Sequence, residues 1–364
     1  MRVVVAPDKF AGTLTAGEAA DAIASGWARH ASADELVRVP MSDGGPGFID
    51  ALHAALGGAL VAVTVPDPYA AATPAAVLLV GRTGYVESAQ AIGLHLTPPN
   101  DRDATRASTV GLGELLRAAV DAGAARVVVG LGGSGTNDGG AGLLAALGAT
   151  AEGGTLDGGP AGLAGVRSVD LEPARRLLGG VELVLASDVD NELLGIVGAT
   201  KTFGPQKGLS EEQLLTVDGW LQGFAEATDR KAASQKGAGA AGGAGFALRL
   251  LGAIHRPGVE VVAEAVGLAE HLRGADLAIT GEGSFDFSSR AGKVPYGVAQ
   301  AAAERLAACI VLAGRVGIGA RETRAIGIES AYSMVELFGE ERALGAPAAT
   351  LADLAARVAR TWSR

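Results

Sequence analysis

The chain has 364 residues, about two and a half times the roughly 150 that serve as a soft prior for one domain, so two domains are expected. Hydrophobic residues make up 48% of the sequence but aromatic residues only 4%, so the core must be built mainly from Ala, Val and Leu. The formal net charge of −10 is the wrong sign for binding a phosphate backbone, and the few aromatics offer little for stacking bases. We therefore expect no nucleic-acid partner.

The sequence also shows no pattern typical of a membrane span, a signal segment, a disulfide or a zinc site. The apolar runs, such as 75–80 and 126–131, are far shorter than the ~20 residues of a membrane span. The first ten residues, MRVVVAPDKF, contain no charged leader or apolar signal segment, so we expect a cytoplasmic protein with no membrane partner. The single cysteine, Cys309, excludes an internal disulfide, and the five histidines show no zinc-ligand spacing.

The N-terminal part of the chain alternates strands and helices. The patterns predict a strand at 3–6, a helix at 15–30, a strand at 36–39 and a helix at 46–56, which is the alternation of a parallel sheet. Residues 59–88 differ, because their three apolar runs are separated by PDPYAAATP and GRTG. Such turn-rich spacing predicts antiparallel strands.

The middle and the end of the chain show a second change of pattern. The middle predicts a helix at 110–122, a strand at 126–130, a Gly-rich turn, a helix at 140–147, a loop at 151–165 and a strand at 181–186. Helical segments follow at 210–230 and around 246–251. The strand–helix alternation then returns, with strands at 275–280, 308–314 and near 331, a helix at 294–306 and a final helix in the last fifteen residues.

Because the two ends share an alternation that the middle interrupts, we predict an α/β fold with two α/β domains. One domain has a Rossmann-like parallel sheet and comprises residues 1–64 plus 290–364. The other is an inserted mixed α/β domain at 65–289, which carries the Gly-rich turn at 130–142. The active site is expected in the cleft between them.

The Gly-rich turn in GLGGSGTNDGG is the strongest local signal. Gly130, Gly132 and Gly135 match the GxGxxG pattern of dinucleotide-binding proteins, but 55 of the 364 residues are glycine, so about one such match is expected by chance. Glycines still allow backbone N–H groups to converge on an anion, and Ser134 and Thr136 add side-chain donors. The turn therefore predicts an anion or phosphate site, and the alternative is a structural turn in which Asn137 or Asp138 caps a helix.

Acidic and basic residues gather just after predicted strands, at the sheet edge where α/β proteins bind ligands. The acids are Asp8, Asp43, Asp138, Asp188, Asp190, Glu282 and Asp286. Asp188 and Asp190 share a face if the segment is extended, so together they could hold one hard cation. The basic candidates beside Gly and Pro turns are Lys9, Lys207, Arg290 and Lys293. This combination suits phosphoryl transfer to an alcohol without a Walker A loop.

Seven ordered blocks resemble the bacterial glycerate kinases of the first structural type, a family that phosphorylates D-glycerate with ATP. The blocks are VVVAPDKFAGTLTA, SDGGPG, the stretch from VGLGELLRAAV to GGAGLLAALG, ASDVDN, GATKTFGPQKG, GAGAAGGAGFAL and ITGEGSFDFSSRAGKVPYGVA. The resemblance covers nearly the whole chain. It implies two α/β domains, ATP as the phosphoryl donor, and a reaction that gives 2-phosphoglycerate and ADP. Phosphoryl transfer also needs a cation to neutralise phosphate charge, so we expect Mg²⁺ as a cofactor. We expect a monomer or homodimer.

With this resemblance, each candidate residue receives an expected role. The expected catalytic residues are Asp188, Asp43 and Lys293. The nucleotide phosphates are expected on Gly132, Gly133, Ser134, Gly135, Thr136, Asn137 and Asp138. Glycerate is expected to contact Lys9, Asp8, Lys207 and Arg290, and Mg²⁺ is expected on Asp188 and Asp190.

Two alternatives stay open from the sequence. One is an NAD(P)-dependent reductase of a small hydroxy acid that uses the GxGxxG match. The other is a non-catalytic sensor of a sugar acid or nucleotide, which would need an output module. No basic helix-turn-helix segment or long linker in the sequence supplies one.

Overall fold

The structure is a computed structural model that describes residues 1–287 and 293–363. The chain divides into two compact units. The first comprises Met1–Asp43, Asp50–Gly57 and Pro257–Arg364, and the second comprises Gly44–Ile49 and Gly58–Arg256.

These boundaries differ from the expected insert at 65–289. The described residues from 257 onward belong to the first unit because β11 (Leu277–Thr280) pairs in parallel with β1 (Arg2–Val5). Residues 58–64 belong to the second unit because β3 (Ala59–Pro66) pairs along its whole length with β4 (Ala72–Val80). Strand pairing between distant parts of the chain therefore sets both boundaries.

The first unit is built on a five-stranded parallel sheet with the order β15-β13-β11-β1-β2. Its other strands are β2 (Glu35–Arg38), β13 (Ala308–Ala313) and β15 (Ser330–Ser333). The chain moves from β1 to one side to form β2, and later returns to the other side for β11, β13 and β15. The connections therefore diverge between β1 and β11, and the carboxyl ends of strands at such a switch point are where doubly wound sheets bind ligands.

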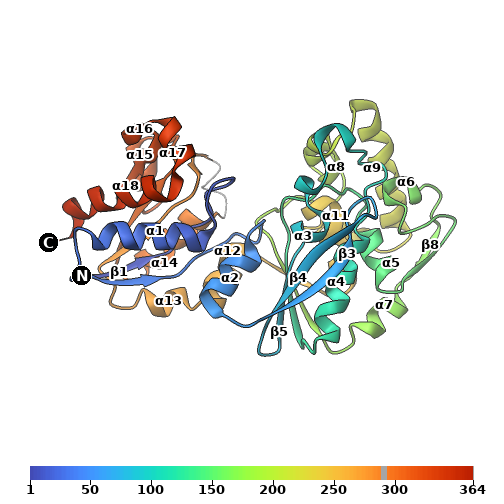
Figure 1. Cartoon of the computed structure of the whole chain (residues 1–364). Coiled ribbons are helices and arrows are strands. Elements are labelled where there is room, and N and C mark those ends of the chain that lie inside the picture. The colour runs from blue at the N-terminus through green and yellow to red at the C-terminus, as the bar shows by residue number, and fades with distance from the viewer. Residues whose placement is uncertain (288–292, 364) are drawn as a thin grey trace. The chain divides into compact units, whose positions relative to one another are not determined.

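Helices cover both faces of this sheet. On one face, α1 (Ala16–Ala28) packs on α18 (Pro347–Trp362) over the buried side chains of β1, and Figure 1 shows the two helices side by side. A capping box between Thr15 and Glu18 starts α1. On the other face, α14 (Val294–Ala303) contacts β11 and β13. The smaller elements are α2 (Phe48–Leu56), α12 (Gly258–Ala265), α13 (Leu268–His271), α15 (Ala320–Ala325), α16 (Met334–Phe338), α17 (Glu340–Gly345), β12 (Ser284–Phe285) and β14 (Arg315–Val316).

The contact between α1 and α18 gives a first stability prediction. A Cβ atom at Gly26 would lie 2.0 Å from the backbone oxygen of Ala352, so Gly26→Ala is expected to push the helices apart and to lower the free energy of unfolding by about 1–3 kcal/mol. Gly17→Ala in the same helix is the control, because its Cβ would meet only Ala54 Cβ at 3.6 Å. Urea denaturation measures both. Equal stability of the two variants would contradict the close approach.

The second unit contains a mixed six-stranded sheet with the order β10-β9-β6-β5-β4-β3. The antiparallel pairing of β3, β4 and β5 (Thr83–Glu87) confirms the prediction for residues 59–88. The strands β5, β6 (Arg126–Gly130), β9 (Glu182–Ala186) and β10 (Ile254–Arg256) run parallel. Their buried apolar residues form the core of the unit.

Helices of very different lengths accompany this mixed sheet. They are α3 (Ala89–Ile92), α4 (Val110–Asp121), α5 (Ala141–Ala146), α6 (Gly159–Gly162), α7 (Glu172–Leu177), α8 (Ala199–Phe203), α9 (Glu211–Glu226), α10 (Arg230–Ala233) and α11 (Ala240–Leu250). Single 3-10 turns lie at Leu94–Leu96, Pro99–Asp101 and Pro205–Lys207. The loop predicted at 151–165 was wrong in part. Its first two residues belong to β7 (Thr150–Glu152), which pairs antiparallel with β8 (Ser168–Asp170), and the connection between these two strands contains α6. Three-residue strands are too short for an alternating pattern to reveal them.

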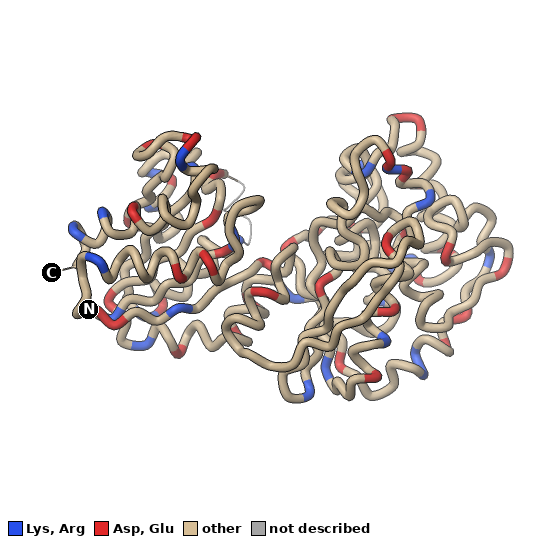
Figure 2. The backbone as a smooth tube through the Cα atoms, viewed as in Figure 1, with Lys and Arg blue, Asp and Glu red and all other residues tan. Residues whose placement is uncertain are grey.

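Charged residues of both signs are interspersed along the backbone of each unit (Figure 2). Among the described residues, no helix combines the length and the apolar composition that a membrane span requires.

Candidate active site

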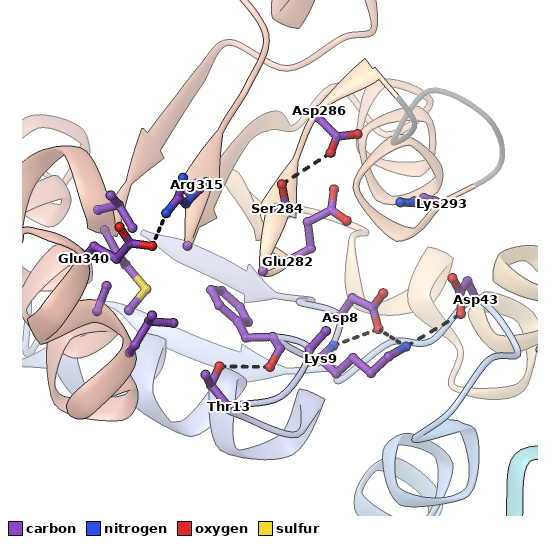
Figure 3. Close-up of a pocket in the computed structure, with 18 residues that line it drawn as sticks. Asp8, Lys9, Thr13, Asp43, Glu282, Ser284, Asp286, Lys293, Arg315 and Glu340 are labelled. Atoms are coloured by element: carbon purple, nitrogen blue, oxygen red, sulfur yellow. Dashed lines mark hydrogen bonds and ion pairs between the residues drawn. The ribbon is translucent and has the colours of Figure 1, made fainter. Parts of the chain in front are cut away.

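A pocket of about 420 Å³ opens at the carboxyl end of the parallel sheet in the first unit (Figure 3). Residues that follow each of its five strands line the pocket: Asp8 after β1, Asp43 after β2, Glu282 after β11, Gly314 after β13 and Met334 after β15. Asp8 and Glu282 follow the two strands that flank the switch point. The doubly wound topology thus brings together residues that are far apart in the sequence.

Charged groups crowd the part of the pocket around Asp8. The Nζ atom of Lys9 lies 3.8 Å from Asp8 Oδ1 and 3.9 Å from Asp43 Oδ1. The backbone N–H of Lys9 donates to Asp8 Oδ1 at 2.7 Å, and the backbone N–H of Asp8 donates to the oxygen of Gly281 at 2.8 Å. Three residues predicted from the sequence therefore meet in one place. Lys9 and Asp8 were expected to bind the substrate, and Asp43 was expected to be catalytic.

The carboxyl of Asp8 has a strongly raised pKa. The residue is only 6% exposed, and burial raises the pKa of its carboxyl to about 7. The charge of Lys9 opposes this rise in pKa, whereas the charges of Asp43 and Glu282 add to it. A carboxyl with a pKa near the working pH can accept and release a proton during a reaction.

Two further residues, Lys293 and Arg290, were predicted for this site. Lys293 lines the pocket at the start of α14, as Figure 3 shows. Arg290, an expected glycerate contact, lies outside the described residues. No role was predicted from the sequence for Ser284, Arg315 or Glu340, which also line the pocket. The rule that found Asp8 and Glu282 would also have found Arg315, which comes two residues after β13.

The Gly-rich turn lies in the second unit and is mostly enclosed. Asp138 is fully buried, and its carboxylate accepts hydrogen bonds from Thr109 N and Oγ1 at 2.8 Å each, from Gly140 N at 3.0 Å and from Gly142 N at 3.1 Å. Burial raises the pKa of Asp138, and these donors oppose the rise. This arrangement matches the structural alternative for Asp138, in which its carboxylate holds the start of α5.

The other residues of the turn differ in their access to solvent. Thr136 and Asn137 are fully buried, and Asn137 Nδ2 donates to Thr200 Oγ1 at 2.9 Å. Gly133 is exposed and Gly132 is half-buried. Gly133 also has a φ of +63°, in the left-handed region that favours glycine. A ligand can therefore reach this turn mainly at Gly132 and Gly133.

Lys207 lies against the turn and not in the pocket of the first unit. It is 2% exposed, and its Nζ atom donates to Ser134 Oγ at 2.9 Å and to the backbone oxygen of Thr136 at 2.6 Å. Burial lowers the pKa of its ammonium to about 7, although the charge of Asp138 acts in the opposite direction. Both hydrogen bonds tie Lys207 to the turn, so its visible role is to hold the backbone at 134–136.

The expected metal ligands follow β9 in the second unit. The side chain of Asp190 is 62% exposed and pairs with Lys236 Nζ at 2.9 Å, whereas Asp188 is half-buried. Within residues 1–287 and 293–363, no group of three acidic, histidine or cysteine side chains is placed to hold a metal ion. A preformed three-ligand protein site is therefore absent from the described part of the chain.

Comparisons with known proteins agree on one family. The sequence profile of the glycerate kinase family matches residues 3–363. A glycerate kinase from Bacillus subtilis is 38% identical over 92% of this chain and 90% of its own length, and a glycerate 2-kinase from Escherichia coli is 37% identical over 93% and 92%. The crystal structure of a protein described as glycerate kinase 2 from Salmonella typhimurium LT2 has a TM-score of 0.86, with 36% identity, and covers 99% of this chain and 98% of that chain. The chain therefore belongs to the glycerate kinase family.

Proposed function

We propose that this glycerate kinase transfers the γ-phosphoryl group of ATP to the 2-hydroxyl of D-glycerate, giving 2-phosphoglycerate and ADP. The observation that carries the proposal is the buried carboxyl of Asp8, which has a pKa of about 7 and lies at the switch point beside Lys9. The Escherichia coli relative, a glycerate 2-kinase, supports the choice of hydroxyl.

In this proposal the residues of the pocket carry out the acceptor half of the reaction. The hydroxyl oxygen of glycerate forms a bond to the γ-phosphorus while the bond from that phosphorus to the β,γ-bridging oxygen breaks. The hydroxyl proton passes to the Asp8 carboxylate, and ADP leaves with the bridging oxygen. Lys9 and Lys293 supply positive charge for the glycerate carboxylate and the transferring phosphoryl group, and Asp43 orients Lys9 across their 3.9 Å contact.

The donor side of the proposal includes Mg²⁺ and the Gly-rich turn. Magnesium takes one or two carboxylates and completes its shell with water and phosphate oxygens, so the oxygen donors of Asp188 and Asp190 fit it. Asp190 would have to leave Lys236 to take part. When bound, the ion neutralises charge on the phosphates. The backbone N–H groups of Gly132 and Gly133 are the proposed phosphate contacts in the turn.

Product identification tests this function. The protein is incubated with ATP, Mg²⁺ and D-glycerate, and the products are analysed by phosphorus NMR. We expect 2-phosphoglycerate and ADP in equal amounts. Formation of 3-phosphoglycerate would contradict the assigned hydroxyl, and no phosphoglycerate would contradict the kinase. A parallel incubation with NADH and hydroxypyruvate tests the reductase alternative, for which we expect no change in NADH absorbance.

A further inference from the structure

The pocket of the first unit is larger than its proposed acceptor requires. Volumes of about 300–1,000 Å³ are typical of sites for drug-sized ligands, and this pocket holds about 420 Å³. Glycerate has only seven non-hydrogen atoms, and every one of its carbons bears an oxygen. It would leave most of the pocket to a second ligand.

The lining of the pocket is divided by chemistry. Lys9, Asp43 and Lys293 lie together at one end, and Arg315 and Glu340 lie at the other, as Figure 3 shows. The lining also includes apolar side chains from the segment after β1 and from α16 and α17, which follow β15: Phe10, Met334, Val335, Ala343 and Leu344. Phe10 and Met334 are buried, but Leu344 is 61% exposed. A small acid rich in oxygen has no surface to pack against such a wall.

We propose that the end of the pocket bounded by Met334, Leu344 and the Arg315–Glu340 pair binds the nucleoside of the donor nucleotide. This inference rests on the proposed kinase function and assigns the base and ribose to the first unit. A purine offers flat apolar faces that suit the exposed side chain of Leu344 and the half-buried side chain of Val335. A bound purine would also cover part of the exposed apolar surface of Leu344, and removal of that surface from water favours binding.

The ion pair at this end supplies the polar recognition that a nucleoside needs. Arg315 forms an ion pair with Glu340, and their side chains are 57% and 59% exposed. Such an exposed pair contributes little to stability, so its partners can exchange for a ligand at small cost. A carboxylate that accepts hydrogen bonds from ribose hydroxyls is a common device in nucleotide sites of α/β folds. Glu340 is placed to do this at the edge of the apolar wall.

Calorimetric titration of the full-length protein with ADP and, separately, with tripolyphosphate tests the inference without any need for turnover. Leu344→Gln is expected to raise the Kd for ADP about tenfold and to leave the Kd for tripolyphosphate unchanged, because only ADP carries a nucleoside. Leu337→Gln is the matched control. Leu337 is an exposed leucine of α16 that does not line the pocket, so its replacement is expected to change neither value.

Glu340→Gln provides an independent test of the ribose contact. It is expected to weaken ADP binding several-fold but to leave binding of 2′,3′-dideoxy-ADP unchanged. An unchanged ADP Kd in Leu344→Gln, or equal weakening of ADP and tripolyphosphate, would overturn the nucleoside site. If these variants behave as expected but the wild-type protein forms no phosphoglycerate, the kinase proposal fails and the nucleoside site stands. If phosphoglycerate forms but Leu344→Gln binds ADP normally, only the nucleoside site fails.

Discussion

Asp8→Asn is expected to lower kcat/KM for glycerate by about 10²–10⁴-fold, the usual contribution of a positioned general base. Asparagine keeps the size of the side chain and the hydrogen bond from the backbone N–H of Lys9 but cannot accept the hydroxyl proton. Steady-state assays with varied glycerate at saturating ATP measure the effect. Asp21→Asn serves as the control, because this aspartate is exposed on α1 and pairs with Arg38 at the surface.

The pH profile separates proton transfer from a structural role for Asp8. Its carboxyl has a pKa of about 7, so wild-type kcat/KM is expected to rise as the pH increases through 7 and the carboxylate forms. Asp8→Asn should lose this limb as well as most of the rate. A variant that loses activity but keeps the limb would show that another group accepts the proton.

Local sequence patterns predicted most of the regular structure. The strand at 126–130 has the predicted bounds, and the helix expected at 110–122 is α4. These segments carry several residues of one periodicity, so their conformation is encoded locally. The domain boundaries were harder to predict. The placement of β11 beside β1 depends on pairing across about 270 residues, and no local pattern contains that information.

The candidate site shows the same division between local and long-range information. Asp8, Lys9, Asp43 and Lys293 were predicted because each lies beside a strand end or a Gly turn, and the fold gathers them in one pocket. Lys207 was predicted to contact glycerate because it lies beside Gly and Pro in PQKG, yet it is buried against the Gly-rich turn. The burial of a single lysine depends on its packing against a distant segment, here residues 134–136. No local sequence pattern reveals such a contact.

Lys207→Met is expected to remove a pH dependence of stability that the wild-type protein has above pH 7. The ammonium has a pKa of about 7 in the folded protein and about 10.5 in the unfolded chain. Between these values the unfolded chain holds a proton that folded Lys207 lacks, so stability rises with pH. From pH 7 to pH 9 this residue alone should raise the free energy of unfolding by about 2 kcal/mol relative to the methionine variant.

Other groups also change their protonation in or beside that pH range. The pKa of Asp8 is raised from 3.8 to about 7, so the stability present below pH 3.8 is lost as the pH rises through 7, a change opposite in sign to that of Lys207. Burial raises the pKa of the Cys309 thiol from 9 to about 12, which lowers stability above pH 9. The pKa of the amino terminus is raised from 8.0, so this group also titrates between pH 7 and pH 9. These contributions are shared by wild type and Lys207→Met, so the difference between their urea-denaturation curves reports Lys207.

The control for this measurement is Lys231→Met, because Lys231 is exposed on α10 and its ammonium stays in water in both states. Its stability should follow that of the wild type across the same pH range. Parallel curves for wild type and Lys207→Met would show that Lys207 keeps its proton in the folded protein. An ammonium that stayed charged there would need a third acceptor beyond Ser134 Oγ and Thr136 O, since it has three protons to donate. The neutral amine needs only these two, so its burial is consistent with the closed packing of the turn.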